Sequence, residues 1–523
     1  MKKITFILFL LLCGLYINPL HASSFPDVRI TTPASPFIDR ETWQNGTISI
    51  SGDLPLPTMN ARIRGRGNST WAAGADKRPL RFRLSEPMSI LGSEYEATDW
   101  ILLANHFDRS LLRNYAALTL AGMLDGLDFT PVPHHVHLYV NNVYMGVYNL
   151  TDERDVGPGR MPLEEGDFFI ELDARAHIDG VENETFFKVN GMLYDLRWPA
   201  NTRENALIAK DYIQNASNAI RTRDFDIMQS YIDIDSFVDF YIVQELFKNS
   251  DIWSLSAFMS VRNGILYMGP VWDFDLAGGN SGIQFMNPEG LYVATTNYWF
   301  YYLLTTPEFF DAVAKRWQEI RPNEVAAMVR HISLTVNNHR AEFERNFQRH
   351  DVMGARLFGS TAETRAIPNF TGHVTHLLNW LNTRIAWLDE FFEDGQISVW
   401  QPLLEYFSNN HILINNVRTN PPAIILGDSQ TRISLCTLEN MFGVDVRFME
   451  NGNMILHKDG ISIIYRKEDF HIFVNDVRID VTPMFLIEVD DFMYVPLRVV
   501  LENLGLDVGW HRDTLGQDSI IIQ

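Results

Sequence analysis

The hydrophobic pattern changes along the chain from a period typical of strands to a period typical of helices. In the first part, apolar residues alternate with polar ones, as in Thr47–Ser51 and Leu80–Leu84, and glycine and proline clusters separate these stretches. Further along, apolar residues recur at helical spacing within residues 237–247, 309–320 and 377–392. We therefore expect an α+β fold with a β-rich first part and a helical second part.

The first 22 residues are typical of a secretory signal peptide. Lys2 and Lys3 precede an apolar run from Ile4 to Tyr16, and small residues follow at Ala22. The run is shorter than the ~20 residues that a membrane-spanning helix needs. Since no later segment is continuously apolar, we expect a secreted protein with no transmembrane segment after signal cleavage.

The charge and the cysteine count exclude two further classes. The formal charge of −22 becomes −24 when Lys2 and Lys3 leave with the signal peptide, so the surface should repel phosphate backbones. We expect no nucleic-acid partner. Signal cleavage also leaves Cys436 as the one cysteine, so no intrachain disulfide forms and stability must come from the core.

The C-terminal part, which we place at residues 397–523, contains an internal repeat. The sequence at His411–Arg418 recurs at His471–Arg478, and Gly443–Val446 recurs at Gly505–Val508. Two copies of a strand, turn, strand, helix, strand unit predict a small α+β domain. The segment YVPLRVVLENLGLDVGW resembles the copper amine oxidase N-terminal-like domain of secreted proteins. Because this part has no close histidine cluster of the kind Cu(II) favours, we expect attachment or recognition, such as contact with the cell wall.

The strongest chemical signal is Gly264–Asn280, where an alternating strand leads two carboxylates into a glycine-rich turn. Asp273 and Asp275 are two residues apart, so on an extended chain they point the same way. Hard cations such as Mg²⁺ or Ca²⁺ prefer oxygen ligands of this kind. A calcium loop of the EF-hand type is excluded, because Ala277 and Gln284 stand where that loop needs oxygen ligands.

A third carboxylate, Asp251, follows the end of the helix expected at residues 237–247. One strand hairpin separates Asp251 from the Asp-Phe-Asp segment. A hairpin of this length returns the chain beside its start, so we expect Asp251 to lie close to Asp273. One acid would then orient a hydroxyl group and another would hold a metal ion.

The basic counterpart lies early, in RIRGRGNSTW at Arg62–Trp71 and KRPLRFRL at Lys77–Leu84. The glycines on either side of Arg66 would let a strand turn cover phosphate groups. On the next strand we expect Lys77, Arg81 and Arg83 to share one face. Cations placed in this way neutralise the charge of a triphosphate.

Together these segments resemble the CotH kinase family. The resemblance runs from about Ile63 to Asp389, and we place the whole domain at residues 27–394. The other segments that carry the resemblance are LANHFDRSLLRNYAA, YVNNVYMGVYNLTDE, NSD at Asn249–Asp251 and WLNTRIAWLDEF. The resemblance implies an atypical protein-kinase-like fold. It also implies transfer of the ATP γ-phosphate, with Mg²⁺ or Mn²⁺, to Ser or Thr of extracellular or spore-coat proteins.

The resemblance also implies roles for individual residues. Asp251 would be the catalytic acid, and Asp273 or Asp275 would bind the metal. Lys77, with Arg81 as a rival and Arg66 in the preceding turn, would meet the phosphates. Glu153 would form an ion pair with that cation.

One departure from ordinary protein kinases keeps other functions open. Those kinases place an asparagine five residues after the catalytic acid to hold a second metal ion, and here Ser256 occupies that position. A hydroxyl group is a poorer Mg²⁺ ligand than a carboxamide. The alternatives are a non-catalytic cell-surface binding protein with a kinase-like scaffold, and a phosphotransferase that acts on glycans or small molecules.

Overall fold

The computed structural model describes residues 24–33, 39–157, 159–161, 163–173, 185–190, 192–199, 202–252, 255–281, 287–393, 413–414, 424–425, 431–449, 453–466, 471–479, 487–489, 492–512 and 518–522. The expected signal peptide, residues 1–22, lies outside these ranges. Within them, no helix has the length and apolar character needed to cross a membrane.

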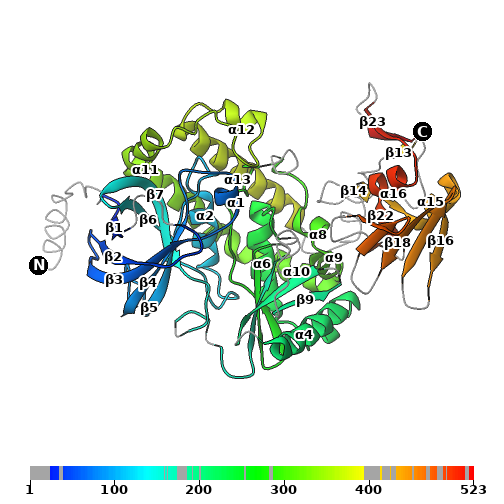
Figure 1. Cartoon of the computed structure of the whole chain (residues 1–523), viewed down its shortest axis with the longest axis horizontal. Coiled ribbons are helices and arrows are strands. Elements are labelled where there is room, and N and C mark those ends of the chain that lie inside the picture. The colour runs from blue at the N-terminus through cyan, green and yellow to red at the C-terminus, as the bar shows by residue number, and fades with distance from the viewer. Residues whose placement is uncertain are drawn as a thin grey trace, which may run out of the picture.

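The first part of the chain forms a closed barrel of seven strands, at the left of Figure 1. The strands are β1 (Asp27–Thr31), β2 (Gln44–Ile50), β3 (Leu56–Gly65), β4 (Leu80–Met88), β5 (Ala97–Leu103), β6 (His134–Val140) and β7 (Val143–Asp152). Their order around the barrel is β1-β2-β3-β4-β5-β7-β6. The barrel closes by parallel pairing of β1 with β6, and the other pairs are antiparallel.

The alternation seen in the sequence sets which side chains fill the barrel. Ile63 and Phe82 point inward and are fully buried, whereas Arg81 and Arg83 of β4 point outward. The turn between β6 and β7 falls at Asn141-Asn142. Both residues have left-handed backbone, with φ of 48° and 64°, which asparagine tolerates better than most residues.

The second part combines a five-stranded sheet with helices. The strands are β8 (Phe168–Leu172), β9 (Phe186–Val189), β10 (Met192–Trp198), β11 (Ala257–Arg262) and β12 (Ile265–Met268), in the order β12-β11-β8-β10-β9. The helices of the first and second parts are α1 (Ser69–Ala72), α2 (Arg113–Ala121), α4 (Arg203–Arg221), α5 (Phe225–Met228), α6 (Ile234–Phe247), α8 (Val293–Thr296), α9 (Tyr298–Leu304), α10 (Pro307–Ile320), the π-helical turn η1 (Arg321–Val325), α11 (Ala326–Arg349), α12 (Ala362–Ala366) and α13 (Phe370–Phe392).

The three predicted helical segments are confirmed as α6, α10 and α13, and the α+β class is confirmed with them. Helix α6 is apolar on every face and almost entirely buried, because α2, α10 and α13 all pack against it. It therefore forms the centre of the largest hydrophobic cluster. A separate cluster fills the barrel.

A smaller apolar cluster joins the outer face of the barrel to the second sheet. Ile101 and Leu103 of β5 pack here with Phe169, Phe258 and Trp272. Trp272 is 2% exposed and directly precedes the Asp-Phe-Asp segment. This contact therefore fixes the candidate site relative to the barrel.

The C-terminal part contains β13 (Leu413–Ile414), β14 (Ile424–Ile425), β15 (Thr431–Ser434), α15 (Leu435–Phe442), β16 (Asp445–Phe448), β17 (Met454–Lys458), β18 (Ile461–Arg466), β19 (His471–Val474), β20 (Val477–Ile479), β21 (Ile487–Val489), β22 (Phe492–Pro496), α16 (Leu497–Asn503), β23 (Val508–Arg512) and β24 (Asp518–Ile522). Its buried residues form their own hydrophobic cluster.

The internal repeat corresponds to a strand–helix–strand unit that occurs twice, as β15-α15-β16 and β22-α16-β23. Gly443 and Gly505 follow the two helices with φ of 63° and 84°, a conformation that favours glycine. Most of the first copy at His411–Arg418 lies outside the described residues, as do residues 394–397, where the two expected domains meet. The domain boundary stays a prediction.

Candidate active site

The Asp-Phe-Asp segment lies in irregular backbone after a tight hairpin. β11 and β12 pair across a turn at Asn263-Gly264, and β12 ends at Met268. Asp273 has left-handed backbone with φ of 63°. The prediction that Asp273 and Asp275 lie on an extended strand is therefore wrong, because the chain turns between β12 and the glycine-rich loop. A non-glycine residue in this conformation is often found at functional sites.

Four carboxylates, Asp108, Asp251, Asp273 and Asp275, form what we call the carboxylate cluster. Burial, followed by the charges of Asp273, Asp251 and Asp108, raises the pKa of Asp275 well above its ordinary value. The charge of Arg113 acts in the opposite direction. The structure thus brings together the three acids that the sequence singled out, although by a different backbone path.

Asp251 is positioned by the turn that ends α6. Lys248 ends the helix with left-handed backbone, and its Nζ donates a hydrogen bond of 3.0 Å to the carbonyl of Asn287. Asn249 accepts a hydrogen bond of 3.1 Å from the backbone N–H of Asp251 and donates one of 3.3 Å to the carbonyl of Trp272. Asn249 therefore ties the Asp251 turn to the residue before Asp273.

The pair of Asp108 and Arg113 is a part of the site that our sequence reasoning missed. Both side chains are fully buried, and Arg113 Nη1 lies 2.5 Å from Asp108 Oδ1. Asp108 also accepts hydrogen bonds from the backbone N–H groups of Leu112 and Arg113, at the start of α2. The signal that could have revealed the pair is an arginine five residues after Asp108, in a stretch that is otherwise largely apolar.

Arg113 connects this pair to the loop that follows Asp275. Its Nε donates hydrogen bonds of 2.9 and 3.2 Å to the carbonyls of Ala277 and Gly278. At Gly279, a Cβ would lie 2.4 Å from the ring of Trp380 in α13, so the loop approaches that helix too closely for any side chain. The glycine-rich turn is therefore held by α2 on one side and α13 on the other.

Two buried asparagines fix the backbone of the Asp-Phe-Asp segment itself. Asn114 accepts a hydrogen bond of 2.8 Å from the backbone N–H of Phe274. Asn280 donates hydrogen bonds of 2.6 Å to the carbonyl of Asp275 and 3.0 Å to the carbonyl of Phe107. Since both aspartates flank Phe274, these bonds set the direction of their side chains.

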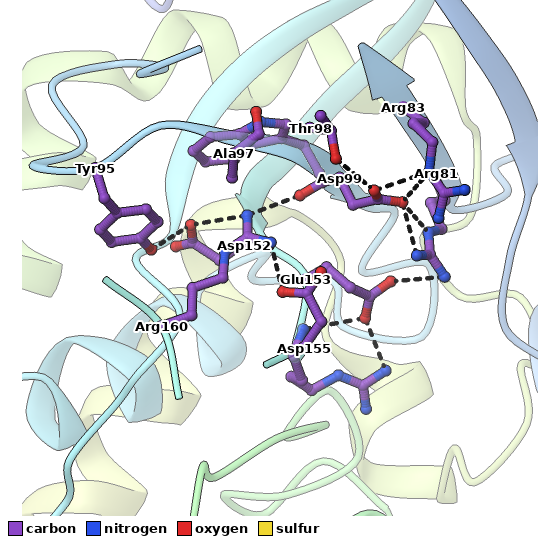
Figure 2. Close-up of polar contacts among 12 residues, drawn as sticks. Arg81, Arg83, Tyr95, Ala97, Thr98, Asp99, Asp152, Glu153, Asp155 and Arg160 are labelled. Carbon is purple, nitrogen blue, oxygen red and sulfur yellow. Dashed lines mark hydrogen bonds and ion pairs between the residues drawn. The ribbon is translucent and has the colours of Figure 1, made fainter. Parts of the chain in front are cut away.

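The outer face of the barrel carries an ion-pair network, shown in Figure 2. Arg81 lies between two carboxylates, 2.7 Å from Asp99 and 3.2 Å from Glu153. Arg83 lies 2.8 Å from Asp99, and Arg154 lies 3.5 Å from Glu153. Despite burial, the charges of Arg154 and Arg81 lower the pKa of Glu153, so Glu153 is a carboxylate near neutral pH.

The network continues through Arg160 at the edge of the barrel. Arg160 pairs with Asp155 at 2.6 Å and with Asp152 at 3.4 Å, and Tyr95 donates a hydrogen bond of 2.6 Å to Asp152. Burial, together with the charges of Glu153 and Asp99, raises the pKa of Asp155 to about 6, although Arg160 acts against the rise. Each carboxylate shown in Figure 2 thus has a cationic partner.

Arg66 and Arg154 connect the network to the Asp-Phe-Asp segment. Their guanidinium carbons lie 5.4 and 4.2 Å from the ring centre of Trp272. Arg66 also contributes to the lowered pKa of Glu153. The predicted residues Arg66, Arg81 and Glu153 therefore gather beside the residue that precedes Asp273.

Lys77 does not lie where the sequence predicted. Strand β4 begins at Leu80, so Lys77 belongs to the preceding loop and does not share the outer face with Arg81 and Arg83. Its side chain is buried, and its Nζ lies 5.0 Å from the ring centre of Tyr148 without a hydrogen-bond partner. Burial lowers the pKa of Lys77 to about 7, against the charge of Asp108. Glu153 pairs with Arg81, the rival cation, and not with Lys77.

The first glycine of the GRGN segment has a structural role that the sequence did not indicate. A Cβ on Gly65 would lie 2.1 Å from the ring of Trp71, whose Nε1 donates a hydrogen bond of 2.8 Å to the carbonyl of Arg66. Gly65 is therefore needed for the close approach of Trp71, and its part in covering phosphate groups stays a prediction. Gly67 has a φ of 79°, which explains the second glycine.

Ser256, at the position of a second metal ligand in ordinary kinases, is buried and has left-handed backbone with φ of 54°. Among the described residues, no group of three or more His, Cys, Asp or Glu side chains is arranged to hold a metal ion. Mg²⁺ in phosphoryl-transfer sites is usually held by one or two carboxylates plus substrate phosphates and water. The pair of Asp273 and Asp275 meets that requirement without a preformed cage.

Comparisons with known proteins agree with this geometry. Residues 62–388 match the family described as CotH kinase protein, and residues 412–516 match the copper amine oxidase N-terminal domain. No curated protein matches the chain. The first match covers more than half of the chain and includes every residue of the carboxylate cluster. The protein belongs to the CotH kinase family.

Proposed function

We propose that this chain is an ATP- and divalent-metal-dependent phosphotransferase that phosphorylates Ser or Thr hydroxyl groups of proteins outside the cytoplasm. The observation that carries the proposal is the raised pKa of Asp275 among Asp273, Asp251 and Asp108. Carboxylates that the fold holds close together repel one another, and a bound cation would relieve that repulsion. Mg²⁺ or Mn²⁺ bound to the phosphates of ATP would be that cation.

The chain divides its charges in the way that phosphoryl transfer requires. Asp273 and Asp275 supply oxygen ligands for the metal ion, which would neutralise charge on the phosphates. Arg81, held by Asp99 and Glu153, and Arg66 supply positive charge next to Trp272. These residues lie on the barrel, whereas the carboxylates lie on the second part, so ATP would bind where the two parts meet.

Asp251 is the group that we assign to the acceptor. It would accept a hydrogen bond from the acceptor hydroxyl and take its proton as the oxygen attacks the γ-phosphorus. The bond between the γ-phosphorus and the bridging oxygen breaks, and ADP leaves with the electron pair. Asn249 fixes the Asp251 turn against Trp272, which keeps the acid in register with Asp273.

Export of the chain and a wall-contacting role for residues 397–523 belong to the same proposal. Both rest on the expected signal peptide and on the repeat, since the structure describes neither residues 1–22 nor a bound partner. The acceptor would then be an extracellular or coat protein.

The full chain, incubated with labelled ATP, Mg²⁺ or Mn²⁺ and candidate acceptors, tests the proposal directly. Transfer of label to protein is expected. Asp251→Asn should lower the rate by about 10²–10⁴-fold, the usual contribution of a general base, without weakening nucleotide binding. Asp273→Asn should weaken binding of the metal–nucleotide complex as well.

Asp311→Asn, at an exposed position of α10, is the matched control and should leave both quantities unchanged. Label in glycan instead of protein would favour a glycan phosphotransferase. No transfer, together with nucleotide binding that Asp273→Asn leaves intact, would identify a non-catalytic binding protein and overturn the proposal.

A further inference from the structure

A groove of about 1030 Å³ lies beside the loop that follows the Asp-Phe-Asp segment. We call it the basic groove. One wall is Asn287, and the other is the stretch from Arg356 to Glu363 together with Arg365. None of these residues was singled out by the sequence, and none takes part in the ion pairs of the site described above.

The groove adjoins the candidate catalytic segments on two sides. At Gly359, a Cβ would lie 2.7 Å from Ser281 and 3.2 Å from Leu276, the residue after Asp275. On the other side, the carbonyl of Asn287 accepts the hydrogen bond from Lys248, three residues before Asp251. The groove therefore borders both the metal-binding segment and the Asp251 turn.

Its position differs from that of the cations assigned to ATP. Arg66 and Arg154 lie over Trp272, which precedes the two aspartates, whereas the groove contacts Leu276 and Ser281, which follow them. A nucleotide held at Trp272 would thus leave the groove to the other reactant, the acceptor.

The charge of the groove contrasts with the acidic chain around it. Arg356 and Arg365 line it, and the side chain of Arg356 is exposed, with no ion-pair or hydrogen-bond partner among the residues that the structure describes. Behind them, Arg109 donates a hydrogen bond of 2.8 Å to the carbonyl of Val352 and supports the wall. Burial and then the charge of Arg365 lower the pKa of Arg109, so the positive charges act on one another. A nearby anion would relieve this repulsion.

The one acid among the lining residues is already engaged. Glu363 accepts hydrogen bonds from its own backbone N–H and from the side chain of Thr361, and these bonds, with a smaller contribution from the charge of Arg365, lower the pKa of its carboxyl group. Glu363 therefore offsets part of the charge of Arg365 and does not act on Arg356.

An exposed aromatic side chain adds an apolar contact at the rim. Phe358 is 62% exposed, and its ring centre lies 5.7 Å from that of Phe107. Phe107 is buried, and its carbonyl accepts a hydrogen bond from Asn280. Asn280 also donates a hydrogen bond to the carbonyl of Asp275. A large apolar side chain held at the surface on a fixed support is typical of a contact site for another protein.

We infer that the basic groove binds the acceptor, and that the acceptor is a protein segment with Asp or Glu side chains next to its hydroxyl residue. The inference rests on the proposed phosphotransferase function and adds the substrate class. Carboxylates of the segment would pair with Arg356 and Arg365, and an apolar residue would cover Phe358. The hydroxyl between them would face Asp251.

Two matched peptides test the inference in the full chain. Each carries one serine, flanked by aspartates in one peptide and by lysines at the same positions in the other. Binding is measured by fluorescence anisotropy with Mg²⁺ and a non-hydrolysable ATP analogue present. The acidic peptide should bind more tightly. Arg356→Glu should weaken its binding by about tenfold and should not weaken that of the basic peptide.

Arg447→Glu, at an exposed arginine of the C-terminal part, is the control for total charge and should change neither affinity. Equal or tighter binding of the basic peptide, or an unchanged affinity of Arg356→Glu for the acidic peptide, would overturn the inference. Phosphorylation of both peptides at equal efficiency would do the same and leave the proposed function standing. Tight binding of the acidic peptide without phosphorylation would overturn the proposed function and support the groove.

Discussion

The outer face of the barrel and the carboxylate cluster both hold many charged side chains, but they differ in how far opposite charges offset one another. On the outer face, arginines stand opposite one another on neighbouring strands, Arg62 across from Arg83 and Arg64 across from Arg81. Asp99 and Glu153 lie close to Arg81 and Arg83 and offset their repulsion. In the carboxylate cluster, Arg113 pairs with Asp108, and Lys77 also interacts with the charge of Asp108, yet the pKa of Asp275 is raised.

The difference separates a structural charge network from a functional one. A paired network needs no ligand: the pKa values of Asp99 and Glu153 are lowered, and Asp155 at the edge of the network is the exception, with a raised pKa. A cluster left with excess charge of one sign costs stability, and proteins usually keep such clusters where a ligand or metal supplies the missing charge. Breaking a pair should therefore destabilise the protein, whereas removing a repelling acid should stabilise it.

The largest expected effect is loss of the buried pair of Asp108 and Arg113. Arg113→Met leaves Asp108 as a buried charge without its cation, and removing one partner of such a pair costs roughly 3–5 kcal/mol. The first unfolding transition in urea should move to a lower denaturant concentration by the corresponding amount. Arg83, a more exposed member of the ion-pair network on the barrel, provides the comparison. Arg83→Met should lower the free energy of unfolding by at most about 1 kcal/mol. Equal losses in the two variants would contradict the distinction.

Asp275→Asn should instead stabilise the folded chain. The pKa of Asp275 is raised in the folded chain, so wild-type stability is lost as the pH rises above the ordinary range of an aspartate towards that raised pKa. Without divalent metal, the variant should therefore unfold at a higher temperature than the wild type at pH 7.5, and at the same temperature near pH 3.5.

Added Mg²⁺ with nucleotide should remove this advantage, because the metal stabilises the wild type and not the variant. A variant that is less stable than the wild type at pH 7.5 without metal would show that Asp275 has a cationic partner in the folded chain. Asp311→Asn is the control on an exposed helix position.

Arg81→Lys tests whether the ion-pair network on the barrel also contributes to ATP binding. The guanidinium of Arg81 contacts both Asp99 and Glu153, and one ammonium group cannot reproduce that geometry. We expect KM for ATP to rise by about tenfold, equivalent to about 1.4 kcal/mol, with a small change in stability. An unchanged KM would place Arg81 among the purely structural arginines.

The sequence predicted which acids come together at this site better than it predicted the backbone that carries them. Alternation on β3 and β4 identified Arg81 as outward-facing, and the order of Asp251, Asp273 and Asp275 identified the acids. The sequence did not reveal that Asp273 lies in left-handed backbone, because aspartate adopts that conformation only when surrounding contacts, here Asn114 and Asn280, impose it.

Three further positions were misplaced or missed, for different reasons. Periodicity assigns a residue to a face only within a strand, and Lys77 lies three residues before β4 begins. The sequence did not reveal that Trp71 folds back onto Gly65. Arg113 was missed because its partners, Ala277 and Gly278, lie more than 160 residues away. Of the three, the position of Arg113 is the one that depends on contact between distant segments.

The smallest expected effect concerns Lys77, which differs from both networks because it is a buried cation without a hydrogen-bond partner in the described part of the chain. Its pKa of about 7 is below the ordinary value, so the folded chain releases a proton that the unfolded chain keeps. Wild-type stability should therefore increase as the pH rises through 7, by about 1 kcal/mol between pH 6 and pH 8. Lys77→Met should abolish this increase and should be the more stable protein at pH 6.

Lys315→Met, at a lysine that is 80% exposed, is the control and should keep the wild-type pH dependence. If Lys77→Met instead keeps that dependence, another group titrates near pH 7; if it is less stable at pH 6, Asp108 stabilises the ammonium more than burial opposes it.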